Sequence, residues 1–199
     1  MKRWMPGLLL MWLWLLPLGA RADDSSGQGT DSYSYNTLEV DHLGVHSDYF
    51  DDRSTGNGLR FSWDTEDMVY VFGQWDKLDF ETLPGSHRIA GLGVGAHTGY
   101  STDTSFYIDL AFLQDKLDSS LGGAVDDYWR ISYGFRSHMT EMLELDGAIS
   151  TERSTTFGGR PFGIRVGAGL DFSALSLQGS VEHTADGNRA LLSLVWAYR

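Results

Sequence analysis

The chain has 199 residues, no cysteine and a formal net charge of −12, with 27 acidic against 15 basic residues. The lack of cysteine excludes disulfide bonds and thiol chemistry. The acidic balance argues against nucleic-acid binding, which needs basic patches, and the length is that of a single domain.

The first 22 residues have the features of a secretory signal peptide. Two basic residues precede an apolar run at 8–18, and Ala20-Arg21-Ala22 has the small-x-small form of a cleavage site. The apolar run is shorter than the roughly 20 residues that a membrane-spanning helix needs. We therefore expect residues 1–22 to direct Sec-type export and to be removed. Three basic and no acidic residues are lost with them, which moves the net charge from −12 to −15.

Beyond the signal peptide, the sequence predicts a polar tail and then one β domain. Residues 23–34 are polar and are expected to form a flexible N-terminal tail. In residues 35–199, apolar and non-apolar residues alternate, most clearly from Phe162 to Phe172, and this period of two is that of strands. The predicted strands are 36–43, 57–64, 68–77, 87–98, 104–115, 126–137, 142–152, 161–172, 174–184 and 188–198.

The predicted connections alternate between long and short. Three of the long ones are 44–56, 78–86 and 116–125, and the connections that follow them are shorter. This alternation is typical of a transmembrane barrel with short periplasmic turns and longer extracellular loops. The sequence thus predicts an antiparallel up-and-down barrel of ten strands, with eight as the alternative. An even strand number would place both termini in the periplasm.

Aromatic residues on the predicted apolar face gather towards the two ends of the strands, with aliphatic residues between them. Two such girdles are typical of barrels that cross an outer membrane. The expected girdle residues are Trp63, Trp75, Phe106, Phe112, Trp129, Phe135, Phe162, Phe172 and Tyr198.

Several stretches resemble the small outer-membrane β-barrel proteins of Gram-negative bacteria, in the broad OmpA-like or OmpX-like porin group. They include Leu92-Gly93-Val94-Gly95, the run 107–111 and the run 164–170. The resemblance implies a monomer in the outer membrane, in contact with lipids and with loops able to meet extracellular ligands. Family members commonly end in an aromatic residue that the outer-membrane insertion machinery reads, whereas here Tyr198 is penultimate and Arg199 is last.

The opposite face of the predicted strands carries charges of both signs on neighbouring strands. In a narrow barrel such charges come within bridging distance. We expect a salt-bridge network that fills the lumen, in which Arg130 pairs with Asp109 or Asp146, and the alternative is a selective pore. The predicted network comprises Asp109, Arg130, Arg136, Glu144, Asp146 and Arg165.

Glycines recur at every second position of the predicted strands. They do not form a nucleotide-binding loop, and they are expected to make room for large inward-facing neighbours. The residues concerned are Gly91, Gly93, Gly95, Gly163, Gly167 and Gly169.

No motif indicates a cofactor, a metal or a catalytic centre. Ser150, Ser154 and His183 could be invoked for a lipid-modifying barrel enzyme, but no motif orients them. The acidic run 48–52 lacks the spacing of a calcium loop. The main interpretation is therefore a structural or surface-interaction barrel or a narrow porin. A soluble exported β-barrel that binds an apolar ligand and a lipid-modifying barrel enzyme are the alternatives.

Overall fold

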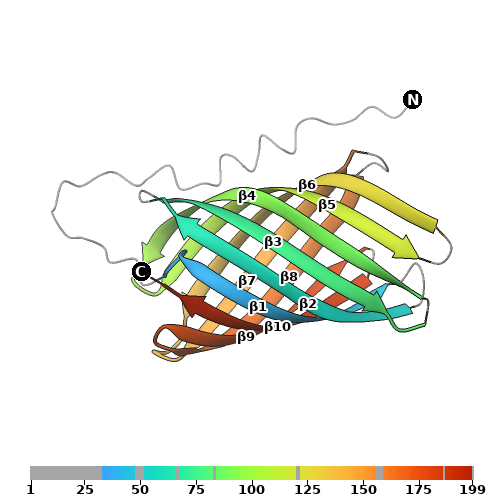
Figure 1. The fold of residues 1–199 in the computed structure, drawn as a ribbon. Coiled ribbons are helices and arrows are strands. Elements are labelled where there is room, and N and C mark those ends of the chain that lie inside the picture. The colour runs from blue at the N-terminus through green and yellow to red at the C-terminus, as the bar shows by residue number, and fades with distance from the viewer. Residues whose placement is uncertain are drawn as a thin grey trace.

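The computed structural model describes residues 33–47, 52–65, 68–82, 84–119, 122–155, 159–185 and 187–198. The described residues form ten antiparallel strands that close into one up-and-down barrel (Figure 1), as the alternation predicts. Among these residues, no helix is long and apolar enough to cross a membrane. The strands are β1 (Thr37–Ser47), β2 (Asp52–Asp64), β3 (Val69–Phe80), β4 (Gly85–Ser101), β5 (Thr104–Ser119), β6 (Gly122–His138), β7 (Leu143–Ser154), β8 (Gly159–Phe172), β9 (Leu175–Thr184) and β10 (Gly187–Ala197).

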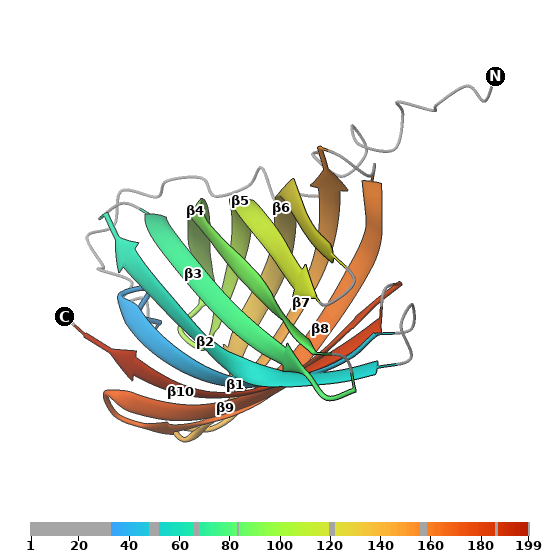
Figure 2. The same ribbon diagram turned by 45° about the vertical axis from the view of Figure 1, so that its right-hand side comes forward.

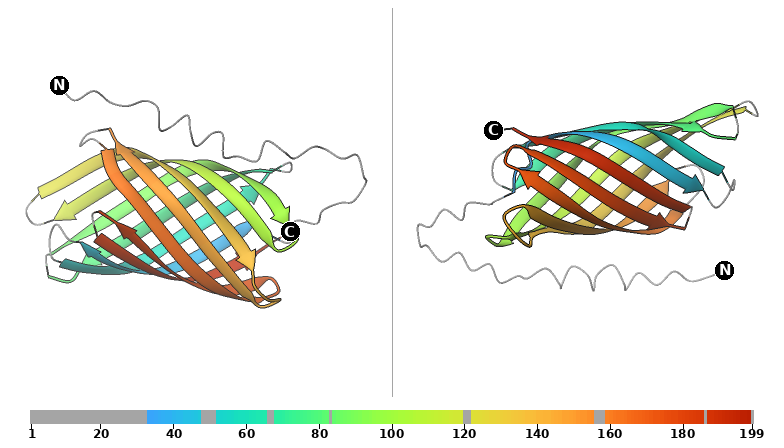
Figure 3. Two further views of the ribbon diagram at one scale, coloured as in Figure 1. Left: turned by 180° about the vertical axis from the view of Figure 1, so that it is seen from behind. Right: turned by 90° about the horizontal axis from the view of Figure 1, so that it is seen from below.

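Each strand pairs with its neighbours in sequence, and β1 pairs with β10 to close the barrel (Figure 3, right). The strands are inclined in the same sense around the barrel, as closure requires (Figure 2). At the closing seam Asp41 lies opposite Ser193, and the Ser193 hydroxyl donates to the Asp41 carboxylate at 2.5 Å. The seam therefore has side-chain hydrogen bonding in addition to its backbone ladder.

The alternation divides the residues between an apolar exterior and a polar interior. On β8, Val166 is 62% exposed on the outside, while Arg165 lines the cavity within the barrel. On β6, Ile131 faces outward and Ser132 lines the cavity in the same way. The aromatic residues expected in the girdles also lie on the outward face, with Phe106 and Tyr198 half-buried and the other seven exposed.

The prediction of long loops is wrong, because strands occupy most of those segments. Residues 44–47 continue β1, 52–56 belong to β2, and β5 and β6 extend to Ser119 and Gly122. Only two or four residues separate consecutive strands. These extensions are polar on the outside and so resemble loops in sequence, yet their backbone groups still pair across the ladder.

The extensions form one end of the barrel, which we call the collar. At the lower edge of the collar, the apolar residues change from the outward face of the strands to the inward face. On β5 the apolar residue Phe112 faces outward, whereas the next residue, Leu113, is fully buried inside. Beyond this point the outside carries the ion pairs Lys77–Asp79, Arg88–Asp118 and Lys116–Asp118, at 3.3 to 3.5 Å. From Phe112 to Ser119 the collar rises roughly 18 Å, for about 3.3 Å per residue and a tilt near 40°.

The opposite end of the barrel holds the described start of the chain. Residues 1–32 lie outside the described residues, and so do the predicted signal peptide and most of the predicted tail. Tyr33 and Ser34 belong to the part of that tail which the structure describes, and they lie at the mouth of the barrel instead of projecting from it. We call this end the terminal end, and the other the collar end.

Candidate functional site

The lumen contains a cavity of about 170 Å³ whose wall is dominated by charged side chains. Its lining extends from Ser34 and Tyr35 at the terminal end to Asp76 and Arg189 towards the collar. The charged residues that line it are Arg60, Arg130, Arg136, Arg165, Arg189, Glu39, Asp41, Asp76, Asp109, Glu144, Asp146 and Glu182. Five arginines thus face seven carboxyl groups, so the wall is slightly acidic when all are ionised.

Arg130 pairs with Glu152, not with Asp109 or Asp146 as expected. Strand pairing puts Arg130 directly opposite Glu152, and the guanidinium Nε donates to Oε1 at 2.7 Å. Both side chains are largely buried. Asp109 instead accepts a hydrogen bond from the Tyr70 hydroxyl on β3.

Two further arginines of the expected network reach carboxylates on β7. Arg136 donates through Nε and Nη2 to the two oxygens of Glu144, at 2.8 and 3.0 Å, which is the bidentate geometry that favours arginine. Arg165 lies 3.4 Å from Asp146 and donates to the Tyr107 hydroxyl at 2.7 Å. The structure thus joins the six residues of the expected network to partners, though only two of the ion pairs lie within that set.

Two inward arginines were not placed in the network by the sequence. Arg189 on β10 donates to Asp76 on β3 at 2.7 Å, which connects strands that are not neighbours. Arg60 donates to Gln74 at 3.3 Å. Sequence alternation identifies such residues as inward-facing, but a contact across the lumen depends on the barrel's width and shear, which alternation does not determine.

Inward-facing rings occupy one side of the lumen because glycines on the adjacent strand leave space for them. A Cβ on Gly93 would lie 2.3 Å from the Phe72 ring, and one on Gly95 would lie 2.2 Å from the Tyr70 ring. On β6, Gly134 leaves the same kind of space for Tyr107. The expectation that strand glycines admit large neighbours therefore holds at Gly93 and Gly95.

The chain segment before β1 folds into the terminal end of the lumen. Tyr35 stacks on His97 with ring centroids 3.9 Å apart and shares a hydrogen bond with Ser105 at 3.0 Å. Tyr33 stacks on His138 at 4.5 Å and donates to the Asp103 carbonyl at 2.7 Å. Burial raises the pKa of Tyr35 to about 12, so its hydroxyl stays protonated and able to donate.

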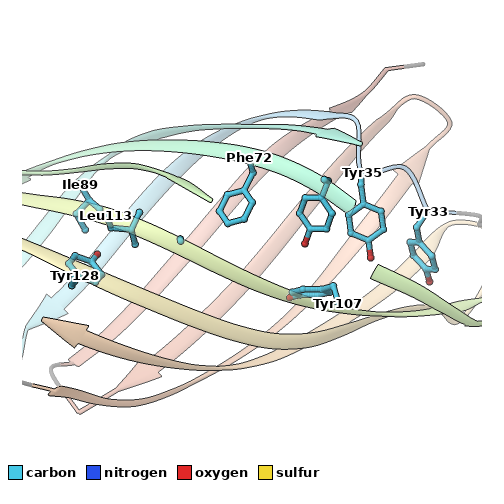
Figure 4. Packing of buried hydrophobic residues seen from close by; sticks show 9 residues of the cluster. Tyr33, Tyr35, Phe72, Ile89, Tyr107, Leu113 and Tyr128 are labelled. Atoms are coloured by element: carbon cyan, nitrogen blue, oxygen red, sulfur yellow. The ribbon is translucent and has the colours of Figure 1, made fainter. Parts of the chain in front are cut away.

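Apolar side chains pack together in the lumen at the collar end, alongside buried carboxyl groups. Ile89, Leu113 and Tyr128 are buried there, and they lie at the opposite end of the row of buried residues from Tyr33 and Tyr35 (Figure 4). The charged cavity thus lies between an apolar cluster on the collar side and stacked rings on the terminal side.

The residues considered for lipid chemistry do not come together. Ser154 is buried inside the barrel and donates to Asp126 at 2.7 Å, whereas His183 is exposed on the outer face and bonds to Asn188 at 2.7 Å. Ser150 lies in the cavity wall, 3.5 Å from Glu182. A serine and a histidine on opposite faces of a sheet cannot share a proton, so these three residues form no catalytic group.

Comparison with known proteins places the fold among outer-membrane β-barrels. No family model matches the chain, and no curated protein matches it. The NanC porin has a TM-score of 0.52 and 7% identity, over 81% of this chain and 99% of that one. The N-terminal β-barrel domain of Pseudomonas aeruginosa OprF has a TM-score of 0.46 and 11% identity, over 83% and 100%. The KdgM porin has a TM-score of 0.45 and 8% identity, over 82% and 99%. At such identities the likeness shows the fold alone.

Proposed function

We propose that the protein is an integral outer-membrane barrel with a structural or surface-interaction role, and that its lumen does not conduct solutes in the state described. The observation that carries the proposal is the pairing of the lumen arginines within a cavity that has buried rings at the terminal end and buried apolar side chains at the collar end. The apolar exterior supports the membrane location, because a soluble barrel would expose this whole surface to water.

The charged wall disfavours the soluble alternative as well. A carrier of apolar ligands needs a mainly apolar cavity with a few polar groups. Here twelve charged residues line a space of about 170 Å³. The collar, which is charged outside, would then be the surface that meets extracellular partners, while the apolar exterior below it contacts lipid.

A narrow porin is the second candidate, and the mainly polar lining that extends from Tyr35 to Arg189 favours it. Conduction would require Tyr33 and Tyr35 to leave the terminal mouth and the collar cluster to rearrange. With seven carboxyl groups against five arginines on the wall, such a pore would prefer cations.

Fractionation and planar-bilayer recording test the proposal together. We expect the protein to require detergent for extraction from outer membranes and to show little steady conductance. Tyr33→Ala together with Tyr35→Ala should raise conductance only modestly, because the collar cluster remains. Large, steady conductance from the unmodified protein would establish a porin instead, and extraction without detergent would contradict the membrane location.

A further inference from the structure

We propose that His138, Glu144 and Asp171 form a binding site for a divalent transition-metal ion such as Zn²⁺ at the terminal mouth of the barrel. One ligand atom from each residue lies within 4.8 Å of the others. The His138 Nε2 atom is 3.0 Å from an Asp171 oxygen and 3.8 Å from a Glu144 oxygen. Ligands about 2.1 Å from a tetrahedral ion are roughly 3.4 Å apart, so these separations match a zinc site with little movement.

The site is built by strand ends, not by mobile loops. His138 is the last residue of β6 and lies directly opposite Glu144 on β7, while Asp171 is next to the last on β8. The backbone N–H of His138 donates to the Asp103 carbonyl at 2.8 Å, and Tyr33 stacks on its ring. The imidazole is therefore held in place with Nε2 directed at both carboxylates.

The donor set and the local charge select the class of ion. One imidazole and two carboxylates suit Zn²⁺ and related ions, whereas Ca²⁺ and Mg²⁺ prefer oxygen ligands alone. Arg136 donates to both oxygens of Glu144, so it compensates one of the two negative charges and fixes the orientation of that carboxylate. One negative charge remains, so a divalent ion would give the site a net charge of +1, with a fourth position open to water.

A second histidine at the same end provides a matched control. His97 lies 3.2 Å from Asp64 and stacks on Tyr35, much as His138 pairs with Asp171 and stacks on Tyr33. Among the described residues, however, the cluster at His138 is the one group of three metal-ligating side chains close enough to hold an ion. In the part of the chain that the structure describes, no third metal-ligating side chain completes a group at His97, so this pair should bind metal weakly.

Titration of the purified, folded protein in detergent with Co²⁺, followed by displacement with Zn²⁺, tests the site. We expect one equivalent of Co²⁺ to give visible absorption bands of a tetrahedral or five-coordinate ion. His138→Gln and Asp171→Asn should each weaken binding by tenfold or more, and His97→Gln should leave it within twofold. Asp171→Asn is the cleaner variant because it leaves the stacking of Tyr33 on His138 intact.

Zn²⁺ should also raise the thermal unfolding midpoint of the unmodified protein and of His97→Gln, but not of Asp171→Asn. Heat-modifiable gel migration identifies the folded form of each variant. Metal bound with equal affinity by all the variants would indicate scattered surface histidines and would overturn the proposal, as would the absence of stoichiometric binding by the unmodified protein.

Discussion

At the scale of single residues, the partner of each lumen arginine depends on strand register. Arg130 meets Glu152 because the β6–β7 hairpin places them directly opposite each other. Arg136 lies opposite Asp146 yet bonds to Glu144, two positions away on the same face. Alternation in the sequence shows that these side chains face inward, but a shift of the turn by two residues keeps the same faces and changes every partner. The sequence therefore predicts the set of lumen charges better than their pairing.

We predict that Arg130→Ala lowers the free energy of unfolding by up to about 3–5 kcal/mol, because it removes the Arg130 guanidinium from the buried Glu152 carboxylate. Water in the lumen should reduce this cost. Reversible unfolding in urea with lipid or detergent present measures it. Glu152→Ala in the Arg130→Ala background should restore part of the loss, with a coupling energy of about 1–3 kcal/mol.

Arg88→Ala serves as the control for that measurement. Arg88 lies on the outside of the collar, 3.5 Å from Asp118, and both side chains are about half exposed. An exposed pair of this kind contributes about 1 kcal/mol or less. Strictly additive effects of the Arg130 and Glu152 substitutions would show that the two side chains do not depend on each other.

At the scale of elements, the face on which a residue lies matters more than its position along the strand. We predict that Ile131→Arg impairs assembly while Ser132→Arg is tolerated, although the residues are adjacent on β6. Ile131 is 47% exposed on the apolar exterior, where an arginine near the midplane of a membrane costs about 2–4 kcal/mol. Ser132 lines the polar cavity. The folded fraction on unheated gels measures assembly.

Equal assembly of these two variants would contradict the membrane location of the exterior, since a water-exposed surface accepts either arginine.

The strand interiors could be predicted from sequence because one apolar and one polar face alternate throughout them. The strand ends at the collar could not, because in segments such as Lys116 to Ser119 both loop and strand would place polar groups in water. Only pairing with β4 and β6 distinguishes the two, and pairing is not local.

In the segment before β1, the spacing of two tyrosines in the sequence indicates which face their side chains occupy. Tyr33 and Tyr35 have the same parity as Glu39 and Asp41, so they continue the inward face of β1 beyond its first residue. Composition nevertheless predicts a flexible tail over residues 23–34, which include Tyr33 but not Tyr35. Their stacking on His138 and His97 depends on residues about a hundred and about sixty positions away, and no local pattern reveals it.

At the scale of the whole molecule, loop length does not indicate which end of the barrel faces the cell exterior, because consecutive strands are joined by two or four residues at both ends. The collar is the feature that distinguishes the two ends. We predict that an epitope inserted at Gly122, the first residue of β6, is labelled on intact cells. An epitope at Glu141, between β6 and β7, should be labelled only after the outer membrane is opened.

The reverse labelling pattern would place the collar in the periplasm and the terminal end outside. An epitope in the segment 44–56 is not a suitable probe, because most of this segment belongs to β1 and β2. At Gly56 in particular, a Cβ would lie 1.8 Å from the backbone oxygen of Lys77, so insertion there would disrupt the sheet.

The seam between β1 and β10 also determines when, during the life of a molecule, its sheet becomes complete. All the other strand pairs join strands that are consecutive in the sequence. The β1–β10 pair cannot form until Ser193 has been synthesised, 152 residues after Asp41. Until then the chain has two unpaired edges, which are templates for association with other chains. Exported molecules truncated within β10 would keep those edges permanently. Such fragments should persist as chaperone-bound or aggregated species and never as smaller barrels.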